Sequence, residues 1–157
     1  MYDFNILIVL LLSMMPIVEA RGSIVYGIAI GLNPLQVLAI SVIGNLVIAP
    51  ILIPVLNLVE RVLRRLNGRI KHLVALYLSL LDNIRSRGRK YIDKYGLLGL
   101  TIFVAVPIPG SGAWTGSILA YIVGFKYIKS IVAINIGVSA TALIVWLSAL
   151  GIIRVFI

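Results

Sequence analysis

Six apolar stretches occupy most of this chain, and their lengths limit how it can fold. A simple helical span of a bilayer needs about 20 apolar residues. Two stretches, residues 35–59 and 127–153, are long enough. The four shorter ones are residues 4–18, 22–32, 97–106 and 113–125. Because 61% of the 157 residues are hydrophobic and only 12% are charged, the chain has too few charged residues to cover the surface of a soluble protein. The sequence therefore predicts an all-α integral membrane protein, multi-pass and resident in the cell membrane.

The four short stretches form two pairs, and each pair meets at a polar break that contains Pro or Gly. The first break is Pro16-Ile17-Val18-Glu19-Ala20-Arg21-Gly22, and the second is Pro107-Ile108-Pro109-Gly110-Ser111-Gly112. Irregular backbone at membrane depth survives only where protein or a water-filled cavity surrounds it. We therefore expect each pair to be a re-entrant or broken helical hairpin, with Pro16, Pro107 and Pro109 at the breaks.

The two halves of the chain follow the same order, a hairpin and then a long helix that carries one Asn. Asn45 lies 29 positions after Pro16, and Asn135 lies 28 positions after Pro107. Each half contributes one complete crossing, so the halves should have opposite orientations. Inverted repeats with paired discontinuous helices are typical of secondary transporters. The alternative is four or five ordinary spans with kinks.

This reading divides a single membrane domain, residues 1–157, into three parts. They are a first repeat (1–59), a basic amphipathic connector (60–94) and a second, inverted repeat (95–157). The connector carries ten of the 14 basic residues: Arg61, Arg64, Arg65, Arg69, Lys71, Arg85, Arg87, Arg89, Lys90 and Lys94. A basic loop of a membrane protein is typical of the cytoplasmic side. We therefore expect the connector to be cytoplasmic and to touch anionic lipid headgroups, and the net charge of +9 does not indicate nucleic-acid binding.

The connector also has one apolar face with helical spacing. Its members are Leu63, Leu66, Ile70, Leu73, Tyr77, Leu80 and Ile84. The pattern favours an interfacial helix or helix pair over a coiled-coil dimer seam. Because 157 residues are few for a complete solute pathway, we expect a homo-oligomer, with a dimer favoured.

Enzyme chemistry and cofactors are not expected. The chain has no Cys and a single His, His72, so thiolate sites, two-His zinc sites and Ser-His-Asp triads are excluded. No nucleophile–base pair and no metal cluster is found in the sequence, so we predict neither a catalytic residue, a metal site nor a cofactor.

The first break contains two charged residues, Glu19 and Arg21. Either charge alone at the bilayer centre costs roughly 2.5–3.5 kcal/mol on insertion scales. Charged residues are therefore found at this depth when they form an ion pair, line a cavity or take part in the function of the protein. Arg21 has a planar fork suited to phosphate or carboxylate, and Glu19 could carry a coupling proton. The alternatives are a structural ion pair, or a turn near the interface where water solvates both.

The second break supplies donors in place of charges. Because Gly110, Ser111, Gly112 and Ala113 open a new half-helix, its first N–H groups lack helical partners and form an anion site. Ser111 and Thr115 add hydroxyls, and Trp114 adds an indole N–H. The alternative is a glycine turn that only packs. Asn45 and Asn135 are predicted to hold helices together by hydrogen bonds or, as a second option, to line the pathway.

Three segments resemble the small multidrug export protein family. They are Glu19-Ala20-Arg21-Gly22, then Pro107-Ile108-Pro109-Gly110-Ser111-Gly112-Ala113-Trp114-Thr115-Gly116, and Lys94-Tyr95-Gly96-Leu97-Leu98-Gly99-Leu100. That family is in turn distantly similar to the DedA membrane proteins. The resemblance implies inverted re-entrant hairpins and a transport role. From the DedA relatives it implies proton-dependent transport and flipping of polyprenyl-phosphate lipid carriers.

The leading hypothesis is a transporter that moves an anionic or amphipathic substrate by alternating access. The substrate would lie between Arg21 and the amides of residues 110–113, and a polyprenyl-phosphate lipid carrier is the class that the resemblance implies. The alternatives are efflux of cationic drugs, which needs the carboxylate of Glu19, and a non-transporting membrane scaffold, in which both charges are structural.

Overall fold

The computed structural model describes residues 2–65, 75, 79, 95–108 and 110–156, and within these ranges every regular element is a helix. The helices are α1 (Tyr2–Met14), α2 (Glu19–Ala29), α3 (Pro34–Leu46), α4 (Ile48–Arg65), a helix at Tyr95–Ala105, α6 (Ala113–Val123) and α7 (Tyr127–Phe156). Pro109 and most of the predicted connector lie outside the described residues.

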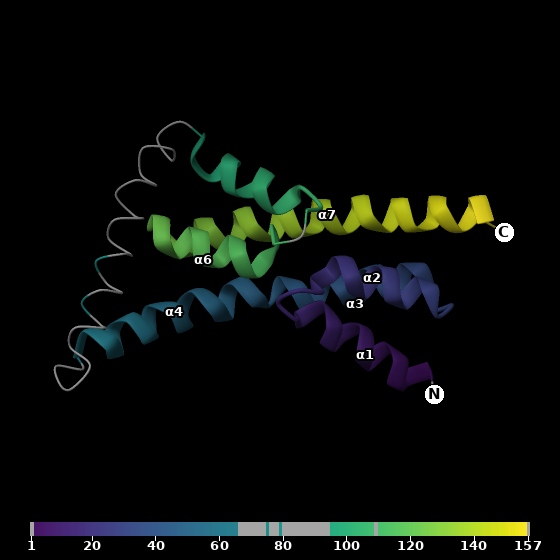
Figure 1. Cartoon of the computed structure of the whole chain (residues 1–157), viewed down its shortest axis with the longest axis horizontal. Helices are drawn as coiled ribbons and strands as arrows, with labels where there is room; N and C mark the ends of the chain where they lie inside the picture. The colour runs from purple at the N-terminus through teal and green to yellow at the C-terminus, as the bar shows by residue number, and fades with distance from the viewer. Residues whose placement is uncertain (1, 66–74, 76–78, 80–94, 109, 157) are drawn as a thin grey trace.

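Two groups of helices lie one after the other along the molecule (Figure 1). At the end that carries both termini, α1, α2 and α3 pack on one another, and at the other end α4 packs on α6 beside the helix Tyr95–Ala105. The long helix α7 runs past both groups and contacts α2, α3, α4 and α6. The two short-helix hairpins, α1–α2 and Tyr95–Ala105 with α6, turn toward each other near the middle.

Each group has its own hydrophobic core, and α7 contributes to both. The first core consists of Val9, Ala20, Ile24, Ile28, Leu32, Val37 and Ala142. The second consists of Ile48, Ala49, Ile53, Leu100, Val104, Ala113, Ala120, Ala133, Ile134 and Val138. Ala142 of α7 therefore packs in the first core, and Ala133, Ile134 and Val138 of the same helix pack in the second.

Prolines explain the break between α3 and α4. The long apolar stretch 35–59 divides at Val47, because Pro50 has no N–H for the carbonyl of Leu46. Pro54 lies inside α4 and leaves the carbonyl of Pro50 without its helical donor. The hydroxyl of Tyr127, at the start of α7, donates a hydrogen bond to that carbonyl at 3.0 Å. A tertiary contact thus replaces the missing helical bond.

Local sequence signals also fix the turn between α2 and α3. Gly31 has a φ of +79°, a left-handed conformation that glycine adopts freely, and it ends α2. Asn33 then caps α3, since its side-chain oxygen accepts hydrogen bonds from the N–H groups of Leu35 and Gln36 at 3.0 and 3.3 Å. Pro34 occupies the first turn of α3, where its missing N–H costs nothing.

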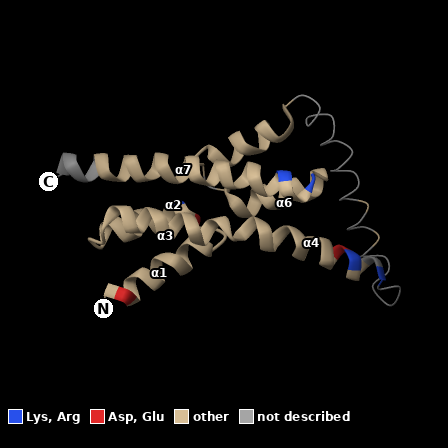
Figure 2. Ribbon diagram, turned by 180° about the vertical axis from the view of Figure 1, so that it is seen from behind, with Lys and Arg blue, Asp and Glu red and all other residues tan. Residues whose placement is uncertain are grey.

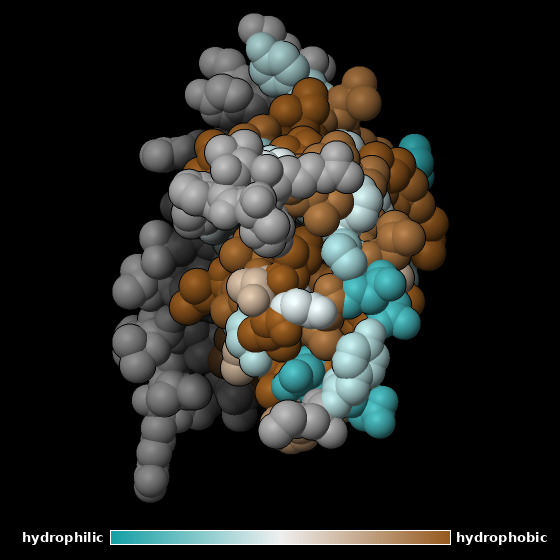
Figure 3. Space-filling view, turned by 90° about the vertical axis from the view of Figure 1, so that its right-hand side faces the viewer, coloured by the Kyte–Doolittle hydropathy of each residue, from teal (hydrophilic) through white to brown (hydrophobic). Residues whose placement is uncertain are grey.

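The surface fits the predicted membrane environment. Two continuous apolar segments, Pro34–Leu63 and Tyr127–Gly151, are long and apolar enough to cross a bilayer, whereas α1, Tyr95–Ala105 and α6 are shorter. Large aliphatic side chains stand exposed on the flanks, among them Leu35 and Ile128 at 66% each. Viewed from the end that carries the termini, most of the described surface is hydrophobic (Figure 3).

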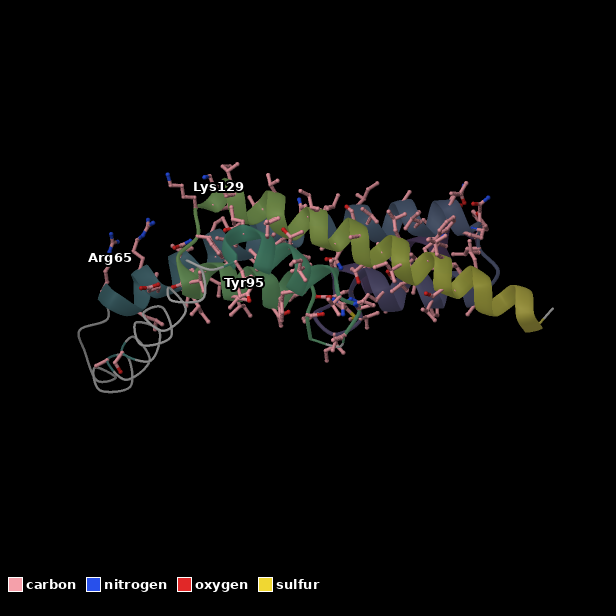
Figure 4. The ribbon with its side chains drawn as sticks, turned by 90° about the horizontal axis from the view of Figure 1, so that it is seen from above. Arg65, Tyr95 and Lys129 are labelled. Carbon is pink, nitrogen blue, oxygen red and sulfur yellow. The ribbon has the colours of Figure 1, made fainter. Side chains whose placement is uncertain are left out.

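Most charged residues in the described part of the chain lie toward the two ends of the ribbon (Figure 2). Glu19 and Arg21 differ, because they belong to the start of α2. Arg65 and Lys129, from α4 and α7, lie at the same end, and Tyr95 lies there as well (Figure 4). A basic end of this kind agrees with the charge asymmetry read from the sequence.

Candidate functional site

The two breaks predicted from the sequence meet each other in the folded chain. The N–H of Trp114, in the first turn of α6, donates to Oε1 of Glu19 at 3.3 Å. The indole Nε1 of Trp114 donates to the carbonyl of Met14, at the end of α1, at 3.0 Å. Arg21 of α2 reaches the carbonyl of Ile108 and the hydroxyl of Ser111. Residues about 90 positions apart in sequence therefore form one polar cluster.

The carboxylate of Glu19 occupies the N-terminus of α6. Gly112, the N-cap of α6, makes no side-chain capping bond of its own. A Cβ placed on Gly112 would overlap the Glu19 carboxylate, so a larger residue there requires this carboxylate to move. Glu19 is buried and holds a φ of +50°, which is uncommon for a residue with a side chain. The first hairpin thus caps a helix of the second.

This contact bears on the predicted anion site. The sequence predicts that a half-helix opens at Gly110 and offers the amides of residues 110–113 to a substrate anion. That start is wrong, because α6 begins at Ala113 with Gly112 as its N-cap, and the Ser111 N–H donates to the carbonyl of Ile108. The Glu19 carboxylate lies against the start of α6, at the place where a bound anion would lie. Any substrate anion that uses the same amides would have to displace Glu19.

Arg21 joins the second break through its guanidinium. Nη1 donates to the carbonyl of Ile108, Nη2 lies 3.3 Å from Oγ of Ser111, and Nη2 lies 3.8 Å from Oε2 of Glu19. Nε is buried and has no hydrogen-bond partner among the described residues. Arg21 therefore uses only part of its fork of five N–H donors in these contacts, and its charge is retained.

The hydroxyl groups of the second break face different partners. Oγ of Ser111 lies 2.7 and 2.8 Å from the carbonyl oxygens of Val106 and Ile108, so it stabilises the turn as well as meeting Arg21. Oγ1 of Thr115 turns back to the carbonyl of Gly112 at 3.3 Å. Thr115 therefore bonds within the start of α6 in this conformation, away from the guanidinium.

Two adjoining cavities lie beside the polar cluster. One, of about 600 Å³, is lined by Ile17, Val18, Arg21, Gly22, Val25, Tyr26, Pro107 and Val145. The other, of about 390 Å³, is lined by Val25, Ile28, Ala29, Pro107, Ile144, Val145, Ser148 and Ala149. Sequence reasoning predicted Arg21 and Pro107 but missed the contribution of α7. Of its lining residues, Ile144, Val145 and Ala149 are apolar and Ser148 carries the one hydroxyl, so neither a charge nor a break in the apolar stretch marks this face in the sequence.

Asn45 and Asn135 line neither cavity. Asn45 is 1% exposed, and the side-chain oxygens of both residues have no partner among the described residues. A different polar pair joins α2 to α3, because the hydroxyl of Ser23 donates to that of Ser41 at 2.8 Å. The described residues contain no group of three or more His, Cys, Asp or Glu that could hold a metal ion.

Comparison with known proteins gives one family match. A family model described as "Putative small multi-drug export protein" matches residues 19–144, which is more than half of the chain and includes Glu19–Gly22 of the first break and the whole second break. No curated protein and no solved structure matches. The more distant similarity to DedA proteins is not shown by these comparisons and stays a prediction.

Proposed function

Because the chain belongs to the small multi-drug export protein family, we propose that it is a multi-pass transporter of the cell membrane that moves an anionic or amphipathic substrate. The observation that carries this proposal is the cavity of about 600 Å³ at the meeting point of the hairpins, with Arg21 in its wall. A guanidinium next to an apolar cavity in a membrane protein suits a ligand that has both an anionic and an apolar part.

In the proposed mechanism, the two halves are inverted repeats with re-entrant hairpins, and they move against each other to give alternating access. Glu19 and Arg21 bond to the second break and so close the middle of the molecule in this conformation. Opening requires these bonds to break. A substrate anion at Arg21 and the α6 amides would take the place of the Glu19 carboxylate and offset the free energy needed for opening.

Proton coupling is proposed to run through Glu19. An ionised carboxylate accepts the Trp114 N–H and attracts Arg21, whereas a protonated one no longer attracts Arg21 and weakens the cap on α6. Binding of a proton at Glu19 would therefore loosen the hairpin contact at the same place where a substrate anion binds. Transport that depends on pH in the wild type and is independent of pH in Glu19→Gln is the expected signature.

The class of substrate comes from the resemblance noted in the sequence. A polyprenyl-phosphate lipid carrier combines a phosphate that suits Arg21 with an apolar chain that suits the cavity. The connector 60–94 is proposed to be cytoplasmic and to lie on anionic headgroups, and a homodimer is the proposed assembly. These features follow from charge and length in the sequence.

The test is transport by purified protein in liposomes loaded with a polyprenyl phosphate. We expect Arg21→Gln to lower the flipping rate at least about tenfold, which corresponds to about 1.4 kcal/mol. Arg65→Gln is the matched control, because it removes the same charge at the basic end of α4 and should leave the rate unchanged. Equal rates in Arg21→Gln and wild type would overturn the role of Arg21.

Cation efflux is a second candidate, favoured by the family description and by the one acidic residue among the described residues near the middle of the molecule, Glu19. A drug-dependent proton flux that disappears in Glu19→Gln would support it. The third reading, a scaffold that does not transport, requires the pair to be purely structural. The exchange Glu19→Arg with Arg21→Glu should then preserve function, whereas it should inactivate a transporter of anions.

A further inference from the structure

The cavity beside Arg21 does not end at the hairpin contact. The two cavities described above share Val25, Pro107 and Val145, so they adjoin and follow one another as a hollow in two parts along the crossing of α2 and α7. We call this hollow the α2–α7 trough. It extends along α2 from Arg21 to Ala29, and at 1.5 Å of helical rise per residue these eight steps span about 12 Å.

The chemistry of the trough changes from one end to the other. Along most of its length the wall is aliphatic, with Ile28 and Ala29 from α2 and Ile144 and Ala149 from α7. Arg21 is the one charged residue in the wall, among the residues that the structure describes, and Glu19 does not line it. The side chains of Val25 and Ile144 are 53% and 46% exposed, so the trough opens on the flank of the molecule. In a membrane protein this flank meets lipid.

We infer that the α2–α7 trough binds one apolar chain of an anionic lipid taken from the surrounding bilayer, with the lipid headgroup at Arg21. This inference rests on the proposed function and specifies its ligand. The cationic end selects a negative headgroup, because Arg21 lines the trough and its guanidinium charge attracts an anion. A small hydrophilic anion gains nothing from the aliphatic wall, and a cationic amphipath is repelled by Arg21.

The absence of Cys from the chain permits a direct test, because one introduced thiol is unique. Ser148→Cys places the thiol in the trough wall. Leu147→Cys is the matched control, since Leu147 is the neighbouring residue of α7, is 61% exposed and does not line the trough. The rate of alkylation by N-ethylmaleimide is measured in a non-ionic detergent, with and without dodecyl phosphate as the probe.

Dodecyl phosphate at about ten times its dissociation constant should slow alkylation of Ser148→Cys about tenfold and leave Leu147→Cys unaffected. Dodecyltrimethylammonium and inorganic phosphate should protect neither thiol. Arg21→Gln should abolish the protection, and so should Val25→Trp, which fills the trough without removing Arg21. Val25→Trp keeps the test decisive if Arg21→Gln fails to fold.

Equal protection by dodecyltrimethylammonium would overturn the inference, because the trough would then select only for apolar chains. Equal protection of Leu147→Cys would also overturn it, since the effect would belong to the micelle. If Arg21→Gln stops transport but dodecyl phosphate never protects Ser148→Cys, the trough is wrong and the proposed function stands. If protection depends on Arg21 while the protein transports nothing, the proposed function fails and the lipid site remains.

Discussion

At the scale of single residues, Glu19 acts as a cap for a helix in the other half of the chain. Helix N-caps usually come from the residue just before the helix, and α6 instead has Gly112 at that position. In place of a local cap, the acidic side chain of Glu19 in the first hairpin accepts a hydrogen bond from the Trp114 N–H in the second. The side chain of Glu19, 93 positions earlier, therefore limits the space for a side chain at position 112.

Gly112→Ala should destabilise the protein by about 1–3 kcal/mol, because the new Cβ would overlap the carboxylate of Glu19. Thermal unfolding of the purified protein measures the change. Gly151→Ala in α7 is the control, since a Cβ there meets nothing within 4 Å, and alanine favours the helix. An unchanged unfolding temperature in Gly112→Ala would contradict the packing of Glu19 against α6.

The residues of this cluster could be predicted from the sequence, but their arrangement could not. Glu19 and Arg21 stood out because charges at membrane depth are rare, and residues 110–113 stood out as a helix start after a proline. Spacing along the chain carries no information on whether the carboxylate faces Arg21, a substrate or α6. Only the approach of the two hairpins in space decides that Glu19 lies on the Trp114 amide.

At the scale of elements, α4 depends on α7 to compensate for Pro54. Tyr127→Phe removes the donor to the carbonyl of Pro50 and should lower stability by about 1 kcal/mol. In a Pro54→Ala background the same change should cost less, because the N–H of residue 54 can then reach that carbonyl within the helix. A double-mutant cycle of thermal stability measures the coupling. Equal costs of Tyr127→Phe in both backgrounds would contradict the compensation.

The sequence predicted the short helices well, because Pro, Gly and polar residues bound them. The stretches 22–32 and 113–125 correspond to α2 and α6, which end earlier, at Ala29 and at Val123. The expectation of a break over Glu19–Gly22 was wrong, because α2 begins at Glu19 and includes these residues. The stretch 35–59 was predicted as one span, and it divides at Val47. The location of that break depends on which carbonyls find tertiary donors, and hydropathy contains no such information.

At the scale of the whole molecule, the termini lie at one end and the basic residues Arg65 and Lys129 at the other (Figures 1 and 4). Single thiols at Asp3→Cys and Lys129→Cys should therefore react with a membrane-impermeant reagent from opposite sides of the membrane. With the basic end in the cytoplasm, intact cells label Asp3→Cys, and Lys129→Cys reacts only after permeabilisation. Labelling of both thiols in intact cells would contradict a structure that spans the bilayer along its long axis.

The continuity of α7 has a mechanical consequence. This helix supplies residues to both cores, through Ala142 on one side and Ala133, Ile134 and Val138 on the other. The rotation of one group of helices relative to the other about the α7 axis is therefore set by this helix. One residue inserted between Val138 and Ala142 would rotate everything beyond it by about 100° and advance it by about 1.5 Å. The residues of each core would keep their own spacing after such an insertion, but the two cores would no longer face their partner helices at the same time.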